Sequence, residues 1–146
     1  MPDARGAESI EQQQVVHVVR RIAAPPDIVY SYLVDPARFV QWMGVRADLD
    51  ARPGGAFEVT VGPDAVAAGE YVLVEAPRRV VFTWGWRGDA DVPPGSSTVE
   101  VLLTPDGEGT LLELRHTGLR SEASRARHNE GWELFVGQLV ALLAGG

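Results

Sequence analysis

The sequence contains no cysteine and no lysine. Without cysteine, the chain can form no disulfide, no thiol nucleophile and no thiolate metal site. The 13 basic residues are all arginine and are outnumbered by 20 acidic residues, which gives a formal net charge of −7. Nucleic-acid-binding surfaces normally carry a basic stripe, so this charge balance argues against a nucleic-acid partner.

Long apolar runs are also missing. No segment approaches the roughly 20 apolar residues that a membrane-spanning helix needs, so we expect no membrane contact. Residues 1–14 are polar and lack the apolar core of a signal peptide. We expect these residues to form a flexible N-terminal arm before a single domain over residues 15–146. Together these absences predict a cytoplasmic protein.

The apolar pattern of residues 15–117 predicts mostly β-strands. A valine-rich segment from Val15 to Ile22 is typical of a first strand. Pro25 and Pro26 then favour the start of a helix, and Asp35 is suited to cap a second short helix. The short gaps between the later segments favour antiparallel pairing. Six further strands are predicted over 45–50, 56–61, 69–75, 79–86, 97–104 and 110–117.

The last quarter of the chain predicts one long amphipathic helix over residues 121–143. Its apolar residues recur at spacings of three and four, which places a wide apolar stripe on one side. Large residues within the strands alternate in the same way, so that one face of the sheet is apolar. The long helix must therefore cover the apolar face of one antiparallel sheet. The predicted stripe consists of Trp132, Phe135, Leu139 and Leu142, with Val136, Val140 and Leu143 beside them.

Several short motifs occur in the order in which a known family carries them. They are the segments 19–25, 35–36, 50–55, 69–71, 81–84, 114–119 and 128–132. Through them the chain resembles, over residues 15–143, the activator-of-Hsp90-ATPase-like group of the START / Bet v 1-like superfamily. The resemblance implies an α+β helix-grip fold, in which a curved seven-stranded antiparallel sheet wraps around a long C-terminal helix and two short helices follow the first strand. It indicates little about activity, because the superfamily includes lipid carriers, cyclases and hydrolases.

The space between the sheet and the long helix is the expected ligand site. Four tryptophans in a small chain suit a pocket for a flat or elongated apolar molecule. The alternative is that these aromatic side chains only fill a core. The residues predicted to line the pocket are Trp42, Phe57, Tyr71, Phe82, Trp84, Trp86, Val101, Leu114, His116, His128, Trp132 and Phe135.

His116 and Tyr71 are the candidate catalytic residues. Strand alternation places His116 on the apolar face, and His128 faces it from the helix, so a neutral imidazole there could act as a general base. The alternative is a buried structural histidine that a backbone carbonyl or a tryptophan N–H satisfies. A two-histidine metal site would need a carboxylate that the pattern does not supply, so we predict no metal and no cofactor.

Three functions are consistent with these observations. The first is a non-catalytic binder, sensor or carrier of a small hydrophobic or aromatic molecule, and the second is a cyclase-like or hydrolase-like enzyme that uses the same cavity. The third, which the resemblance alone implies, is the activation of a chaperone ATPase. Residues 1–14 leave no room for the extra N-terminal domain of the eukaryotic activators, so this function is expected least. Leu102 and Leu111 on the outer sheet face could pair two copies into a homodimer.

Overall fold

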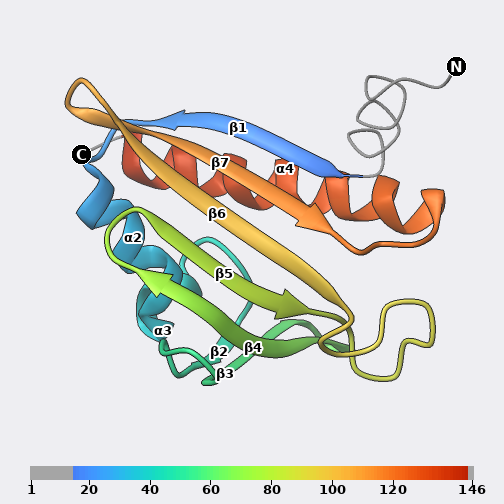
Figure 1. The fold of residues 1–146 in the computed structure, drawn as a ribbon. Coiled ribbons are helices and arrows are strands. Elements are labelled where there is room, and N and C mark those ends of the chain that lie inside the picture. The colour runs from blue at the N-terminus through green and yellow to red at the C-terminus, as the bar shows by residue number, and fades with distance from the viewer. Residues whose placement is uncertain (1–14, 145–146) are drawn as a thin grey trace, which may run out of the picture.

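A computed structural model describes residues 15–144 of the chain. One antiparallel sheet of seven strands, in the order β1-β7-β6-β5-β4-β3-β2, lies against a long C-terminal helix (Figure 1). This arrangement confirms the predicted helix-grip fold. The elements are β1 Val16–Ile22, α2 Pro26–Val34, α3 Pro36–Phe39, β2 Arg46–Leu49, β3 Ala56–Gly62, β4 Ala65–Glu75, β5 Arg79–Trp84, β6 Ser97–Asp106, β7 Gly109–Thr117 and α4 Glu122–Ala144.

The two short helices begin where proline and aspartate favour them. Pro26 and Pro36 occupy the first turns of α2 and α3, where a helix does not need the missing N–H group. The Asp35 side chain caps α3 as predicted, because its Oδ1 accepts a hydrogen bond from the Ala37 backbone N–H at 3.0 Å. Phe39 at the end of α3 is buried. The helices therefore carry apolar side chains into one end of the sheet.

The long helix α4 lies behind β1 and β7 in Figure 1. Its buried side chains follow the predicted spacing of three and four. Leu142 is 40% exposed, so its assignment to the buried stripe was wrong; the stripe continues from Leu139 to Leu143, four residues further on. Among the described residues, no helix combines the length and the hydropathy that a transmembrane span requires.

The strands around the end of β5 differ from their predicted bounds. β4 begins at Ala65, four residues before its predicted start, and β5 ends at Trp84, although Trp86 still forms an isolated bridge with Ala67. Gly85 explains this end, since a Cβ atom there would lie 1.7 Å from the Pro93 backbone oxygen. Only glycine lets the following loop cross so closely, and the regular ladder stops at this crossing.

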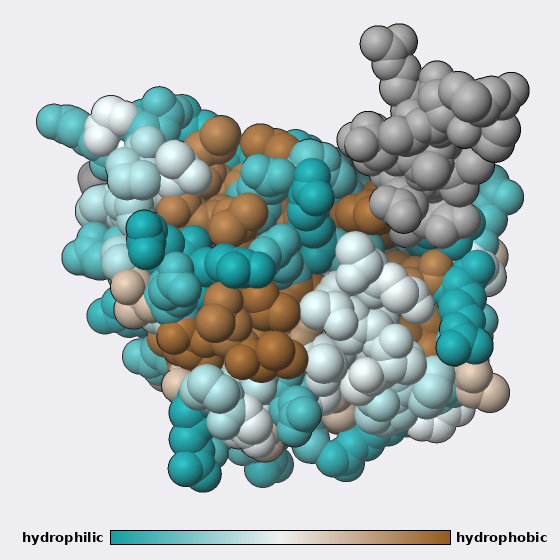
Figure 2. All heavy atoms as spheres, viewed as in Figure 1, coloured by the Kyte–Doolittle hydropathy of each residue, from teal (hydrophilic) through white to brown (hydrophobic). Residues whose placement is uncertain are grey.

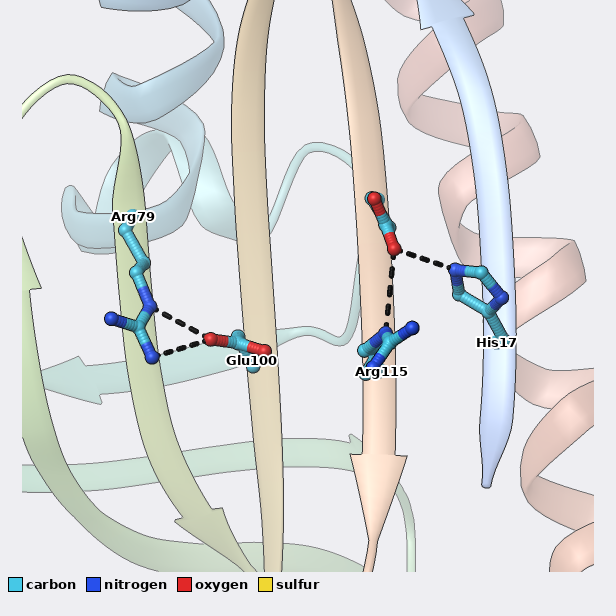
Figure 3. Close-up of polar contacts among 5 residues, drawn as sticks. His17, Arg79, Glu100 and Arg115 are labelled. Carbon is cyan, nitrogen blue, oxygen red and sulfur yellow. Dashed lines mark hydrogen bonds and ion pairs between the residues drawn. The ribbon is translucent and has the colours of Figure 1, made fainter. Parts of the chain in front are cut away.

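The outer face of the sheet carries a band of paired charges (Figure 3). Arg79 on β5 contacts Glu100 on β6 at 2.6 Å, and Glu113 on β7 contacts His17 on β1 at 2.8 Å. Hydrophobic areas lie above and below a hydrophilic band in the space-filling view (Figure 2). Leu111 on this face is 38% exposed. Pairing of two copies through this face remains a prediction.

Candidate functional site

The predicted inner surface contains a cavity beside the first half of α4. Its volume is about 360 Å³, and it lies between the first half of α4, the start of β4 and the segment that follows β5. Five residues predicted to bind a ligand line it: Trp84, Trp86, His128, Trp132 and Phe135. The remaining lining residues are Met43, Ala65, Asp89, Arg127 and Gly131.

The other predicted ligand-binding residues lie in the packed core and do not line this cavity. They are Trp42, Phe57, Tyr71, Phe82, Val101, Leu114 and His116. The rings of Phe57 and Phe82 stack with centroids 4.1 Å apart, and Phe39 packs edge-on against Phe57. Side chains of α3 thus fill the space that we expected to be hollow. We assign these seven residues to the core.

His116 is fully buried, and both of its ring nitrogens are hydrogen-bonded. The Trp132 Nε1–H donates to His116 Nδ1 at 3.0 Å, so Nδ1 must be the acceptor nitrogen. His116 Nε2 lies 2.8 Å from Ser97 Oγ, whose own hydroxyl donates to the Trp84 carbonyl at 2.7 Å. Nε2 therefore carries the proton and donates it to Ser97. Burial, with a smaller contribution from His128, lowers the pKa of His116 to about 3, so the ring is neutral.

His128 is held in the opposite tautomer. The Trp86 Nε1–H donates to His128 Nε2 at 2.9 Å, and His128 Nδ1–H donates to the Ser124 carbonyl at 2.7 Å. Burial is the largest of the effects that lower the pKa of this histidine. Each histidine is thus satisfied by a tryptophan N–H, which is the structural alternative that the sequence left open.

Tyr71, the second candidate catalytic residue, is also engaged. Its side chain is buried, and its hydroxyl donates to the Leu33 carbonyl at 3.2 Å. Burial, together with the charges of Tyr30 and Asp50, raises the pKa of Tyr71 above its usual value. The phenol therefore keeps its proton, and it points into α2 and not into the cavity.

The segment after β5 forms one wall of the cavity and is fastened to α4. The Asp91 carboxylate accepts hydrogen bonds from the hydroxyls of Ser121 and Ser124, and these bonds, Ser124 first, lower the pKa of Asp91. Val92 is buried, and its carbonyl accepts from the Trp86 backbone N–H at 2.7 Å. Trp86 is thus held at two points: its backbone N–H bonds to Val92, and its indole N–H bonds to His128.

Asp89 and Arg127 form the polar rim of the cavity. Asp89 is half-buried and Arg127 is exposed, and both line the opening. Neither residue was predicted from the sequence, because charged side chains carry no apolar signal. Gly131 was not predicted either, although it is three residues from His128 and four from Phe135, on the same side of α4. Within residues 15–144, no three side chains of metal-ligating type gather at one point.

The fold and the cavity define the class of protein, a helix-grip protein with an apolar cavity beside its C-terminal helix. A family model described as "Activator of Hsp90 ATPase homolog 1-like protein" matches residues 23–144. The chain belongs to this family.

Individual relatives agree with this assignment. The AHSA1-like protein RHE_CH02687 from Rhizobium etli is 40% identical, with a TM-score of 0.73 over 90% of this chain and 82% of that protein. DynU16, from the dynemicin biosynthetic locus, is 30% identical, with a TM-score of 0.79 over 90% of this chain and 47% of its own. The uncharacterized protein C1711.08 of Schizosaccharomyces pombe is 34% identical over 95 residues, 63% of this chain. The chain covers only 25% of that relative's length.

Proposed function

We propose that the protein binds a small, apolar, flat molecule in the cavity beside α4 and does not transform it. The observation that carries this proposal is a wall of apolar rings whose polar atoms are largely occupied. Trp86, Trp132 and His128 bond to protein partners, and they present mainly ring surface to the space. Such a wall favours burial of an apolar guest through the hydrophobic effect.

The size of the cavity supports a small ligand. A volume of about 360 Å³ lies at the lower end of the range for ligand pockets, roughly 300–1,000 Å³. The indoles of Trp84 and Trp86 meet edge to face, with centroids 5.2 Å apart, and Trp132 lies 5.0 Å from Trp84. Rings at these mutual angles offer flat surfaces on more than one side. A molecule of one or two fused rings fits this description best.

The same contacts argue against an enzyme that uses His116, His128 or Tyr71 as its acid or base. A general base needs a ring nitrogen or a carboxylate that can reach a substrate proton. The basic nitrogens of His116 and His128 both accept from an indole N–H, and the Tyr71 hydroxyl is turned toward α2. None of the three can exchange a proton with a guest without breaking a buried hydrogen bond.

Two glycines of α4 give a matched test of this proposal. Gly131 lines the cavity and Gly137 does not, and a Cβ atom at either position would meet nothing within 4 Å. Gly131→Leu should fill the cavity, whereas Gly137→Leu makes the same chemical change outside it. We would titrate each variant with the neutral fluorescent probe N-phenyl-1-naphthylamine.

We expect saturable probe fluorescence with the unaltered chain and with Gly137→Leu, and its loss with Gly131→Leu. Circular dichroism and thermal melting would show that both variants fold. Equal binding by the two variants, or no saturable binding by the unaltered chain, would refute the proposed site. A melting temperature that rises with probe concentration would give independent support, since a ligand stabilises the state that it binds.

Activation of an Hsp90-type ATPase is the second candidate, because the matching family model carries that description. This function would use the protein surface and not the cavity. It predicts direct association with the Hsp90 of the source cell and a faster ATPase rate. Gly131→Leu should leave both unchanged, so the two functions are separable with one variant.

A further inference from the structure

The arginines of this chain differ in whether they form an ion pair with a carboxylate. Three of them, Arg120, Arg125 and Arg127, form no ion pair with a carboxylate of residues 15–144. Every other arginine in that part of the chain does form one. Arg120 lies two residues before α4, and Arg125 and Arg127 lie in its first two turns. The arginines without an ion pair therefore lie close together along the chain.

Two of these arginines share a cleft. It is lined by Ser96, Gly118, Leu119, Arg120 and Arg125, has a volume of about 410 Å³, and shares no residue with the apolar cavity. Arg125 Nη1 donates to the Leu119 carbonyl at 2.9 Å, which holds its guanidinium against the cleft wall. The backbone N–H groups of Leu119 and Arg120 donate to no backbone acceptor within residues 15–144.

Gly118 brings the two sides of the cleft together. Its φ of +88° lies in the region that glycine favours, and a Cβ atom there would lie 3.3 Å from the Ser96 oxygen. The end of β7 can therefore approach the start of β6 closely, just before Arg120. The position of the cleft follows from this turn.

Neither Asp91 nor Glu122 forms an ion pair with Arg120 or Arg125 within residues 15–144. Asp91, whose carboxylate accepts hydrogen bonds from the hydroxyls of Ser121 and Ser124, keeps its negative charge and offsets part of the positive charge at the start of α4. The cleft is thus lined by two arginines and one serine, and the backbone N–H groups of Leu119 and Arg120 belong to residues that line it. These are the groups that bind oxyanions in proteins.

We propose that this cleft binds a phosphate group carried by a small molecule. Two guanidinium charges match the charge of a phosphate monoester, which is −1.5 to −2 near pH 7. A carboxylate carries only one charge and two oxygens, and should bind more weakly. This inference does not depend on the apolar cavity or on its proposed ligand.

The test is a titration with inorganic phosphate at constant ionic strength, with sodium chloride as the balancing salt. Binding would be followed by the NMR shifts of the backbone amides of residues 96 and 118–121. Arg120→Gln and Arg125→Gln each remove one cleft charge. Arg127→Gln is the matched control, because Arg127 is also unpaired and lies on the same helix but lines the other cavity.

We expect saturable shifts at these amides, a loss of affinity of about tenfold for Arg120→Gln and Arg125→Gln, and little change for Arg127→Gln. Acetate should bind about tenfold more weakly than phosphate. Shifts that do not saturate, or an equal loss with Arg127→Gln, would show general screening of charge and overturn the proposal. Equal affinity for acetate and phosphate would overturn the assignment to phosphate. The side chain of Arg120 forms no hydrogen bond within residues 15–144, so Arg120→Gln tests the site even if Arg125→Gln fails to fold.

Discussion

Two aromatic clusters lie on the same face of the sheet, and only one of them borders a cavity. Near α3, the rings of Phe57, Tyr71 and Phe82 pack against one another and Phe57 packs against Phe39, with centroid separations between 4.1 and 6.2 Å. Near the start of α4, Trp84, Trp86 and Trp132 are packed at comparable distances, yet space of about 360 Å³ remains beside them. Both clusters consist of aromatic rings, and all of these rings are buried except Trp86, which is partly buried.

The difference between them lies in the residues that face the sheet. At the α3 end, Phe39 and Trp42 project into the space between helix and strands. At the other end, α4 presents His128, Trp132 and Phe135, and Gly131 between them has no side chain to fill the remaining space. Whether aromatic side chains form a core or a pocket therefore depends on the opposing element, and the ring count of the strands does not decide it.

The largest expected effect concerns the packed cluster. Phe57→Ala removes a fully buried ring that touches Phe39, Tyr71 and Phe82. Removal of such a ring leaves a void, and the free energy of unfolding should fall by about 3–5 kcal/mol. Urea denaturation followed by tryptophan fluorescence measures this loss. A decrease below about 1 kcal/mol would show that the cluster near α3 is not packed as described.

The second effect concerns the histidine pair that packs against the tryptophan cluster. The pKa of His116 is about 3 in the folded protein and about 6.5 in the unfolded chain, so the unfolded state binds more protons between these values. The contribution of neutral His116 to the free energy of unfolding is complete above about pH 6.5 and is lost as the pH falls toward 3. Between pH 6.5 and 5 the loss from His116 alone should be about 1.5–2 kcal/mol. His128, whose pKa is also lowered, acts in the same direction.

Urea titrations at pH 7.5, 6.5, 5.5 and 5.0 would measure this slope. Aspartate and glutamate titrate mainly below this window, so the histidines dominate the change. His116→Gln, which cannot gain a proton, should lower stability at pH 7.5 but show a shallower dependence on pH. An unchanged slope in that variant would assign the effect to other groups.

Much of the fold could be predicted from the sequence, because burial alternates with a period of two in strands and recurs every three or four residues in α4. Asp35 and the prolines marked the short helices correctly. The errors occurred where a single contact overrides periodicity. β5 ends at Trp84 because Pro93 crosses over Gly85, and Leu142 is exposed because the stripe turns toward Leu143.

The candidate site was predictable only in part. Alternation placed Trp84, Trp86 and His116 on the inner face, but it does not say which side chains oppose them across the fold. Phe39 fills the space at the α3 end of the sheet because of the path that α3 takes, and no local sequence pattern predicts that path. Gly131 could have been found from its position on the stripe, since a glycine between His128 and Phe135 interrupts an otherwise large-residue face.

The third prediction concerns an aromatic ring at the cavity. Phe135 is half-buried and lines the cavity, so Phe135→Ala removes little packed surface. We expect a loss of stability of about 1 kcal/mol or less, well below that of Phe57→Ala. Binding of N-phenyl-1-naphthylamine should nevertheless weaken by about tenfold. A large loss of stability without weaker probe binding would place Phe135 in the core and not in the site.

The smallest expected effect separates helix propensity from the function of the cavity. Gly131→Ala and Gly137→Ala should each stabilise α4 by up to about 1 kcal/mol, because a Cβ atom at either position has free space and alanine is the better helix former. The two positions lie more than one turn apart, so the effects should add in the double variant. Thermal unfolding measures the gain. A gain at both sites, with reduced probe binding for Gly131→Ala alone, would indicate that glycine at 131 preserves the cavity at the expense of the stability of its own helix.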